Sequence, residues 1–393
     1  MEEYDVAVIG AGPAGSMAAK RASQNGAEVL LLEEHSSVGW PVQCAGLLGV
    51  KAIEESELGL GSFVIRSIHG ADIHSPSGHI LSFCTKETKA WVVERRLFDQ
   101  ALLTETARQG VDFRIGSPVT RLVRNRGESV LTIGHGADSW NVKAKVVISA
   151  EGVSARIARS AGIEPPRKIL SSAQVEVPFK VEDPDKVEVH LGKGAAPGFF
   201  AWVIPSRNGA ARVGLSCREG AYEQLKKFLR SDPLRPRLQG GFLDLVVGGL
   251  PLGPPKSVVT EGLIAVGDAA GQVKPTSGGG IYPGLICAKI AGEVAASAAQ
   301  EGDASAFRLQ EYEKRWRKVL GRELSLGMRV HEMVAKMDDK DLGELIRHLN
   351  DNQNLIEIIE KYGDVDRPSV AIKKIAPRLG LSGLRIARMF WRH

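Results

Sequence analysis

The sequence predicts an α/β fold in which an N-terminal βαβ domain is interrupted by a mostly antiparallel β-sheet domain and followed by a helical C-terminal region. Three observations predict this class. A β-branched run ends in a glycine-rich turn at residues 10–15, a second glycine-rich segment follows at residues 267–280, and residues 170–260 alternate in short strand-like runs. A chain of 393 residues is also too long for one small core, so two closely joined domains are expected.

The N-terminal segment has the pattern of a βαβ unit. Residues Tyr4–Ile9 form a β-branched run, residues 10–15 read Gly-Ala-Gly-Pro-Ala-Gly, and Glu28–Leu32 forms a second apolar run that is followed by Glu33. Small residues at helical spacing connect the turn with the second run. A G-x-G-x-x-G turn between a strand and a helix, with an acid after the next strand, is typical of a Rossmann-like dinucleotide-binding domain.

The residues of this turn have distinct physical roles. Gly10 permits the tight turn, Gly12 lets the backbone approach a pyrophosphate, and Gly15 allows the helix to pack closely on the strand. The start of the helix, at Ala14, offers free N–H groups and a partial positive charge to the phosphates. Glu33 is placed to accept hydrogen bonds from a ribose diol, and its charge disfavours a 2′-phosphate. The alternative is a glycine turn without a ligand.

The second glycine-rich segment predicts contact with the other end of the same dinucleotide. The run Leu263–Val266 reads as a strand that delivers Asp268 at its carboxyl end, where an acid can hydrogen-bond a polyol. Gly279 and Gly280 then precede an apolar helix that begins at Ile281. Free N–H groups and the positive end of the helix dipole would face a flat ring and stabilise its anionic reduced form. FAD has such a polyol and ring, so we expect FAD as the cofactor; a flexible loop before a helix is the alternative.

The remaining elements set the expected domain boundaries. We expect a discontinuous FAD-binding domain over residues 1–165 and 261–304, a β-sheet substrate domain over 166–260, and a helical region over 305–393. The composition changes at Pro165-Pro166, and charge pairs at i,i+4 spacing are frequent after residue 305. Within the first domain we expect one further helix and three further strands, at Leu97–Gln109, Val111–Ile115, Val119–Val123 and Lys145–Ala150.

Composition excludes several classes of protein. Apolar residues make up 43% and charged residues 25% of the chain, as in an ordinary globular protein. The four cysteines are dispersed, without C-x-x-C or a His/Cys cluster, so we expect no metal site and reduced thiols in a cytoplasmic protein. The βαβ pattern begins almost at Met1, which argues against a signal peptide, and no long apolar run predicts a membrane span.

The net charge of +5 is concentrated in the C-terminal tail. Residues 367–393 hold seven Lys/Arg and no Asp/Glu, whereas the rest of the chain holds 44 basic and 46 acidic residues. Apolar and aromatic residues are interspersed among these cations, so the tail can form a basic amphipathic segment. Two interpretations stay open: peripheral contact with an anionic membrane surface, or a packed helix with a solvated basic face. Nucleic-acid binding is not expected, because no recognised binding motif accompanies the charge.

Together the two glycine segments resemble the glutathione-reductase-type FAD superfamily, in the branch shared by aromatic hydroxylases and geranylgeranyl reductases. The resemblance covers the chain from residue 4 to about residue 299. Residues 95–99 are similar to the branch's R-x-x-F-D motif, which implies that Arg95 lies beside the FAD, and Val119 falls where the family's strand passes the adenine. Residues 150–156 loosely resemble D-G-x-x-S-x-x-R, with Glu151 in place of the aspartate, so Glu151 is either a site acid or a surface acid.

Residues 197–205 discriminate within this branch. Archaeal geranylgeranyl reductases carry P-x-x-Y-x-W-x-F-P, and this chain matches both prolines and Trp202, with Phe200 for the tyrosine and Ile204 for the phenylalanine. Such an apolar wall suits a polyprenyl chain, which only contact area and dispersion can hold, so Phe200 and Trp202 are the expected substrate residues. Ile204-Pro205 is also similar to the W-x-W-x-I-P of flavin-dependent halogenases, although those place Trp where this chain has Ser16. An aromatic strand in a sheet core is the third interpretation.

The loop at residues 41–46 carries a cysteine, as the loop of geranylgeranyl reductases does. The resemblance implies that Cys44 and Ala45 lie near the isoalloxazine and help to hold the FAD. The family continues with Gly-Glu or Gly-Asp-Gly, whereas this chain has Ala45-Gly46-Leu47 and lacks the acid. No clear general acid can be read from the sequence; Cys44, or a water behind it, is the candidate proton donor, and an inert small apolar residue is the alternative.

The resemblance implies an FAD-dependent reductase that saturates C=C bonds in the geranylgeranyl chains of archaeal-type ether lipids, by hydride transfer from reduced flavin. Because no second G-x-G-x-x-G occurs, ferredoxin, a reduced deazaflavin and transiently bound NAD(P)H stay open as the reductant. Two alternatives remain: a flavin-dependent monooxygenase or halogenase, and an electron-transfer flavoprotein without alkene chemistry. A basic tail would suit a cytoplasmic enzyme that docks peripherally at an anionic lipid surface.

Overall fold

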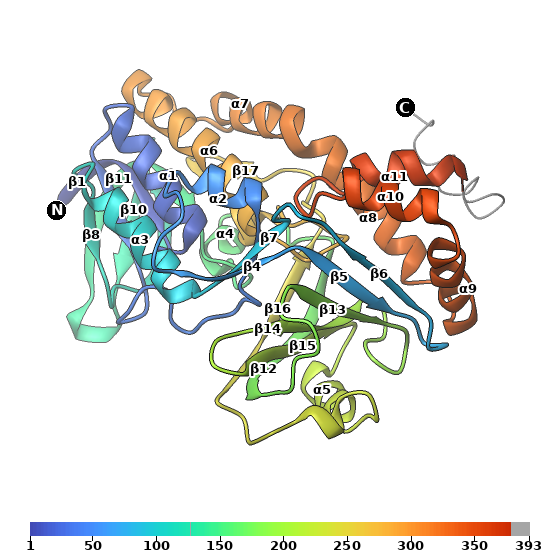
Figure 1. Cartoon of the computed structure of the whole chain (residues 1–393). Coiled ribbons are helices and arrows are strands. Elements are labelled where there is room, and N and C mark those ends of the chain that lie inside the picture. The colour runs from blue at the N-terminus through green and yellow to red at the C-terminus, as the bar shows by residue number, and fades with distance from the viewer. Residues whose placement is uncertain (126, 379–393) are drawn as a thin grey trace.

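The computed structural model describes residues 1–125 and 127–378, in which two large sheets are flanked by helices (Figure 1). The strands of the first sheet are β1 (Glu2–Ile9), β2 (Val29–Leu32), β8 (Asp112–Arg114), β9 (Val119–Asn125), β10 (Glu128–Ile133), β11 (Trp140–Ser149), β17 (Val259–Thr260) and β18 (Leu263–Ala265). Their order is β17-β18-β11-β1-β2-β8, with the β9–β10 hairpin attached to β11. The strands from β18 to β8 pair in parallel, so their carboxyl ends meet at one edge of the sheet.

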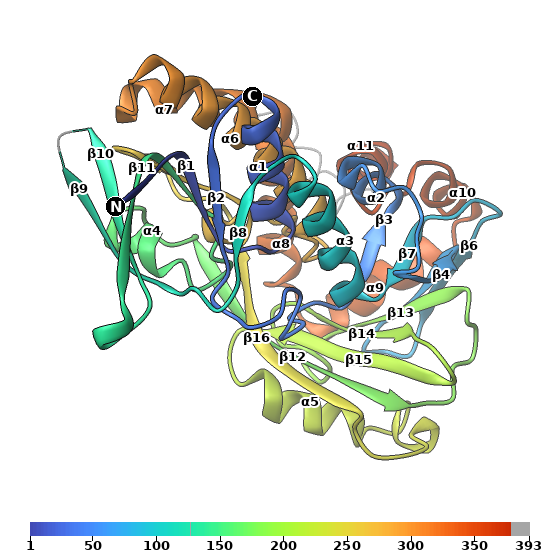
Figure 2. The ribbon, with the colours of Figure 1, turned by 90° about the vertical axis from the view of Figure 1, so that its left-hand side faces the viewer.

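Two helices pack together on this parallel sheet, α1 (Pro13–Gln24) and α6 (Ile281–Glu301) (Figure 2). Helix α6 is buried along most of its length, as its continuous apolar sequence predicts. The two helices approach closely at Gly292, where a Cβ would lie 2.4 Å from the carbonyl oxygen of Ala18. Helix α3 (Arg95–Ala107) packs beside α1 and begins at Arg95, two residues before the expected start.

The second sheet has seven strands: β5 (Gly70–His74), β6 (Ile80–Cys84), β12 (Lys168–Pro178), β13 (Lys186–Leu191), β14 (Phe200–Pro205), β15 (Ala210–Cys217) and β16 (Asp244–Leu252). Their order is β16-β12-β15-β14-β13-β5-β6, and every pair is antiparallel except β13–β5. Helix α5 (Ala221–Leu229) covers one face through a compact apolar cluster. The opposite face, with Gln174 and Trp202, lies toward the first domain.

Strands β5 and β6 belong to this second sheet, although the expected boundaries place residues 70–84 in the FAD-binding domain. β5 pairs with β13 from Gly70↔Lys186 to His74↔His190, across more than a hundred residues of sequence. Gly70 is required at this place, because a Cβ there would lie 2.0 Å from the carbonyl oxygen of Phe83 on β6. The substrate sheet is therefore built from two distant segments of the chain.

A small three-stranded sheet and short helices join the two domains. The strands are β3 (Leu47–Gly49), β4 (Val64–Ile68) and β7 (Ala90–Val93), and the helices are α2 (Val50–Ser56) and α4 (Arg156–Ser160). The C-terminal helices α7 (Ala306–Trp316), α8 (Arg322–Val334), α9 (Asp339–Asn350), α10 (Gln353–Tyr362) and α11 (Ser369–Ile375) follow α6. Helices α8 to α11 gather at the end of the second sheet that carries β6 (Figure 1). Within residues 1–125 and 127–378, no helix combines the length and apolarity needed to cross a bilayer.

Candidate active site

The first glycine turn leads from β1 into α1, and its three glycines meet different surroundings. A Cβ at Gly10 would lie 2.5 Å from the carbonyl oxygen of Ala150, and Gly10 has a φ of +97°. A Cβ at Gly15 would lie 1.8 Å from the carbonyl oxygen of Gly10. Apart from its chain neighbours, no described residue has an atom within 4 Å of the Cβ position of Gly12. Gly10 and Gly15 are thus needed for internal packing, whereas Gly12 leaves room in front of the N-terminus of α1.

Glu33 follows β2 at the same edge of the sheet and is buried. One carboxylate oxygen accepts the N–H of Ala11 at 2.8 Å, and the other accepts the N–H of His35 at 3.0 Å and contacts His35 Nδ1 at 2.6 Å. The backbone N–H of Ser117 donates to the Glu33 carbonyl at 2.8 Å. This bond brings the start of β9, at Val119, close to Glu33. His35 was not anticipated from the sequence; its position two residues after the acid was the available signal.

The second glycine segment lies against the first. A Cβ at Gly267 would lie 3.0 Å from the Cβ of Ala14, so the turn after β18 approaches the first turn of α1. Asp268 follows in this turn, and a Cβ at Gly280 would lie 2.8 Å from its Oδ1. Two segments that are distant in sequence therefore converge at the carboxyl edge of the parallel sheet, where α/β folds bind ligands.

Asp268 provides a test of whether the site fits FAD. Its carboxyl forms no hydrogen bond with another described residue, and burial raises its pKa to about 6 while nearby Arg95 opposes the shift. Asp268 is half-buried, and a partly desolvated carboxyl without a protein partner is available to a ligand. The unpartnered carboxyl and the open space at Gly12 fit the polyol and the pyrophosphate of FAD.

Arg95 joins the cofactor side of the site to the cysteine loop. Its guanidinium is buried and binds Asp99 through two hydrogen bonds, of 3.1 and 3.0 Å. Burial alone would lower the pKa of Arg95, but Asp99 and the adjacent Cys44 thiol raise it overall, so the group stays charged. The Sγ of Cys44 accepts the N–H of Gly46 at 3.3 Å. Arg95 and Cys44 thus lie side by side.

Side chains of the second sheet hold the cysteine loop in place. Gln174 donates its amide N–H to the Cys44 carbonyl at 3.3 Å and accepts the indole N–H of Trp202 at 2.9 Å. Arg212 donates to the carbonyl oxygens of Ala45 at 3.2 Å and Val93 at 2.9 Å. Gln174 and Arg212 were missed from the sequence; polar residues between buried apolar ones on β12 and β15 were the signal.

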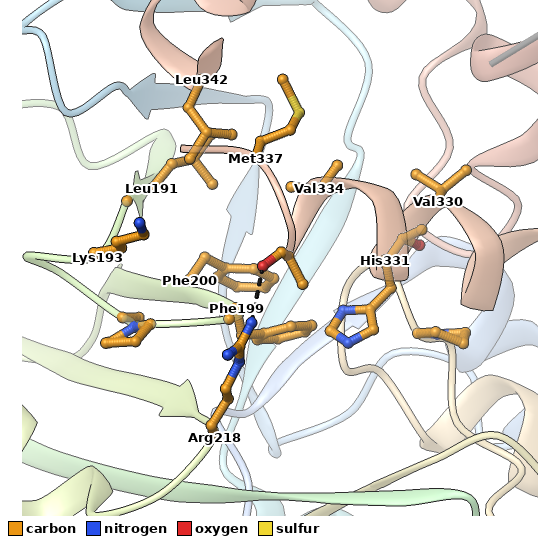
Figure 3. A pocket seen from close by; sticks show the side chains of 17 residues that line it. Leu191, Lys193, Phe199, Phe200, Arg218, Val330, His331, Val334, Met337 and Leu342 are labelled. Carbon is orange, nitrogen blue, oxygen red and sulfur yellow. Dashed lines mark hydrogen bonds between the residues drawn. The ribbon is translucent and has the colours of Figure 1, made fainter. Parts of the chain in front are cut away.

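An apolar cavity of about 290 Å³ lies between the second sheet and the C-terminal helices (Figure 3). Phe199 and Phe200 stack in its wall with ring centroids 4.3 Å apart, and Pro275 and Thr276 contribute from the loop before Gly278. The hydroxyl of Thr276 is buried without a partner among the described residues. The rest of the cavity wall comes largely from the end of β13 and from the α8–α9 region. These residues are Leu191, Val330, His331, Val334, Met337 and Leu342.

The structure separates the two expected substrate residues. Phe200 lines the cavity, whereas Trp202 is absent from its wall. The indole of Trp202 packs over Gly214, where a Cβ would lie 2.6 Å from its Cζ2, and its ring contacts Phe200 edge-on at 6.1 Å. Trp202 therefore acts on the cysteine loop through Gln174 and supports Phe200 from behind.

A buried ion pair ties the loop of residues 271–280, here called the flavin loop, to the C-terminal region. Lys274 Nζ lies 2.7 Å from Asp366 Oδ1 and also donates to the Val365 carbonyl at 2.8 Å. The other oxygen of Asp366 accepts the N–H of Ala52, at the start of α2, at 3.3 Å. Lys274 in turn abuts Gly279, where a Cβ would lie 2.7 Å from its Cε. Asp366 directly precedes the predicted basic tail, and residues 379–393 of that tail fall outside the described ranges.

Two other polar groups have structural roles. Glu151 accepts the N–H groups of Ile157 at 2.9 Å and Ala158 at 3.0 Å, so it caps the start of α4. His74, Glu188 and His190 place ligand-type atoms within 4.8 Å of one another. The two imidazoles stack face to face, with their centroids 4.3 Å apart, and Arg237 binds both oxygens of Glu188. Because the two rings are stacked in parallel, their in-plane lone pairs do not converge on one point, so we interpret this group as the surroundings of the Glu188–Arg237 ion pair.

The fold and the converging glycine turns define an FAD-dependent oxidoreductase, and comparison with known proteins narrows the class. A family model described as pyridine nucleotide-disulphide oxidoreductase matches residues 4–189. Digeranylgeranylglycerophospholipid reductase of Methanocaldococcus jannaschii is 35% identical over 365 residues, which cover 90% of this chain and 93% of the relative. The chain therefore belongs to the geranylgeranyl reductase family.

Solved structures agree with this assignment. A geranylgeranyl bacteriochlorophyll reductase-like protein of Thermoplasma acidophilum superposes with a TM-score of 0.86 at 27% identity, over 99% of this chain and 100% of that chain. The p-nitrophenol 4-monooxygenase of Pseudomonas putida superposes with a TM-score of 0.71 at 18% identity, over 92% of this chain and 98% of that chain. The second likeness extends to the fold alone.

Proposed function

We propose that this protein saturates isolated C=C bonds in the geranylgeranyl chains of ether lipids, with FAD as the cofactor. Residues 1–165, apart from strands β5 and β6, together with residues 261–304, hold the cofactor, while the second sheet and the C-terminal helices form the substrate site. The residues assigned to FAD are Gly10, Gly12, Ala14, Gly15, Glu33, Cys44, Ala45, Arg95, Val119, Asp268, Gly279, Gly280 and Ile281.

One observation carries this proposal: an apolar cavity of about 290 Å³ ends on the loop that leads into the glycine start of α6. Pro275 and Thr276 belong to both the cavity wall and this loop. An isoprenoid chain has no polar group along its length, so it can be held only by apolar contact of the kind that Phe199 and Phe200 offer. The name of the Methanocaldococcus relative supports the same class of substrate.

FAD, when bound and reduced, supplies a hydride from its N5. Reduction of the alkene would also need a proton on the adjacent carbon, which the residues of this chain must deliver. An isolated alkene is not polarised, so the task of this chain's residues is to fix the double bond and exclude water. Cys44, or a water at the buried Thr276 hydroxyl, is the candidate source of the proton.

An anaerobic single-turnover experiment tests the proposal. The FAD-loaded protein is reduced with dithionite and mixed with digeranylgeranyl lipid, and flavin reoxidation is followed with mass analysis of the lipid. We expect reoxidation with a gain of 2 Da per bond reduced, and no reoxidation with the saturated lipid as the control. Unchanged lipid mass would contradict the proposal. Lipid-dependent consumption of O2, with oxygen incorporated into product, would favour a monooxygenase instead.

The reductant and the site of action belong to the same proposal. Ferredoxin, reduced deazaflavin and NAD(P)H can be compared by the rate at which each reduces the bound flavin. The basic segment that begins at Arg367 would bring the enzyme to an anionic lipid surface. Co-sedimentation of the full chain with anionic vesicles, but not with neutral vesicles, is the expected result.

A further inference from the structure

Gln272, in the flavin loop, closes the turn that carries Asp268. Its side chain is fully buried, and its Oε1 accepts the backbone N–H of Gly267 at 2.8 Å. The backbone N–H of Gln272 donates to the Gly267 carbonyl at 3.0 Å, and the N–H of Gly271 donates to the Asp268 carbonyl, also at 3.0 Å. Gln272 thus binds both backbone groups of Gly267, and Asp268 projects from a closed turn.

This turn lies between the starts of α1 and α6. A Cβ at Gly267 would lie 3.0 Å from the Cβ of Ala14 on α1, and a Cβ at Gly280 would lie 2.8 Å from Asp268 Oδ1. The Asp268 carboxyl has no hydrogen-bond partner of its own among the described residues, so its direction depends on the backbone of the turn. A rotation of the Gly267 peptide would therefore change where the carboxyl points.

The other end of the Gln272 amide reaches α7. Its Nε2 donates to the hydroxyl of Tyr312 at 2.8 Å, and that hydroxyl donates to the Ala265 carbonyl, at the end of β18, at 3.3 Å. The Tyr312 side chain is fully buried, and the Cys287 thiol of α6 also contacts its hydroxyl. Burial raises the pKa of both Tyr312 and Cys287, so both groups stay protonated at neutral pH. Helix α7 packs along α6, outside the residues expected to form the cofactor domain (Figure 1).

We propose that Gln272 and Tyr312 are positioning residues for FAD, which act through the turn that aims Asp268 at the cofactor. A buried amide is costly unless its hydrogen bonds replace those to water. An apolar side chain of similar size would fill the same space, so we assign the amide to holding the turn. The inference rests on the proposed function and extends cofactor binding to α7, beyond residues 261–304.

The test is a double-mutant cycle on FAD affinity, measured by titrating the FAD-free protein and following flavin fluorescence. Gln272→Leu should raise the dissociation constant of FAD about tenfold, the weight of one buried hydrogen bond. Tyr312→Phe keeps the ring and removes only the hydroxyl, so it should raise the constant about threefold. Asp268→Ala should itself weaken binding. In the Asp268→Ala background, each of the other two changes should alter FAD affinity less than about twofold, because they act through Asp268.

Glu313→Ala is the matched control, because Glu313 follows Tyr312 on α7 and accepts the Ser257 hydroxyl at 3.0 Å without touching the turn. It should leave FAD affinity unchanged. Urea unfolding of each FAD-free variant separates weaker FAD binding from loss of the fold, and Tyr312→Phe decides if Gln272→Leu does not fold.

Three results would overturn the inference: unchanged FAD affinity in Tyr312→Phe, unchanged affinity in Asp268→Ala, or equal fold-changes with and without Asp268. If the wild-type protein itself binds no FAD, the proposed function fails. That outcome is distinct from a wild-type protein that binds FAD and variants that bind it equally well.

Discussion

The two ends of the site are built in different ways. At the nucleotide end, backbone groups and glycines of two segments do most of the work, and the key contact is between Ala14 and Gly267. At the cavity end, side chains from three regions meet: the second sheet, the flavin loop and the C-terminal helices. A backbone site depends on local conformation, whereas a side-chain site depends on long-range docking. Substitutions should therefore damage the two ends in separable ways.

The largest effect is expected at the Lys274–Asp366 ion pair, which couples the cavity end to the C-terminal region. Asp366 is 1% and Lys274 6% exposed at the side chain, so removing one partner leaves a buried, uncompensated charge. We expect Lys274→Met or Asp366→Ala to lower the free energy of unfolding by about 3–5 kcal/mol. Urea unfolding of both variants measures this change.

The matched control is Lys51→Met, which breaks the more exposed Lys51–Asp364 pair on the same segment. We expect this change to cost less than about 1 kcal/mol. Equal losses at the two pairs would mean that the buried pair does not fix the C-terminal segment against the flavin loop.

A second comparison separates the glycine needed for internal packing, Gly15, from the glycine that leaves room for the cofactor, Gly12. Gly15→Ala forces a Cβ to within 1.8 Å of a carbonyl oxygen, so α1 must move away from the turn. We expect a loss of up to about 3 kcal/mol in unfolding free energy, together with loss of FAD. Gly12→Ala meets open space, so it should fold normally and weaken only the binding of FAD. Unfolding curves of the FAD-free protein and FAD titrations separate the effects. Normal FAD affinity in Gly12→Ala would contradict the placement of the pyrophosphate there.

The difference between local conformation and long-range docking also explains which features the sequence could predict. The βαβ turn, the acid after β2 and the helix after the second glycine segment follow from local patterns, and the structure places all three at one sheet edge. The pairing of β5 with β13 spans more than a hundred residues and has no local signal beyond Gly70. The Gln174–Cys44 and Lys274–Asp366 contacts likewise join distant segments, so their residue types alone did not predict a role. Trp202 was predicted as a substrate residue, whereas the fold packs its indole over Gly214, outside the cavity wall.

A third prediction asks whether Gln174 supports the cysteine loop or binds the substrate. Gln174→Leu leaves the indole N–H of Trp202 and the carbonyl of Cys44 without their partner, which should cost about 2 kcal/mol of stability. Since the loop lies beside Arg95, we also expect flavin reoxidation by lipid to slow while the half-saturating lipid concentration stays constant. Ser172→Ala, which breaks the Ser172–Ser216 hydrogen bond on the same sheet, is the control and should leave reoxidation unchanged. A change in half-saturation alone would instead place Gln174 in the substrate site.

The smallest effect is expected from His331, and it appears only as a dependence on pH. The folded-state pKa of about 4 lies below the ordinary value of 6.5, so the unfolded chain binds the extra proton more readily. The contribution of neutral His331 to stability is therefore complete above pH 6.5 and is lost as the pH falls toward 4. At pH 5 we expect a loss of at most about 2 kcal/mol relative to pH 7.5, and His331→Gln should remove that part of the pH dependence. His348→Gln, at an exposed histidine on α9, should leave the wild-type profile intact. Urea midpoints between pH 7.5 and 5 measure the difference, and parallel profiles for His331→Gln and the wild type would mean that the cavity does not hold this imidazole neutral.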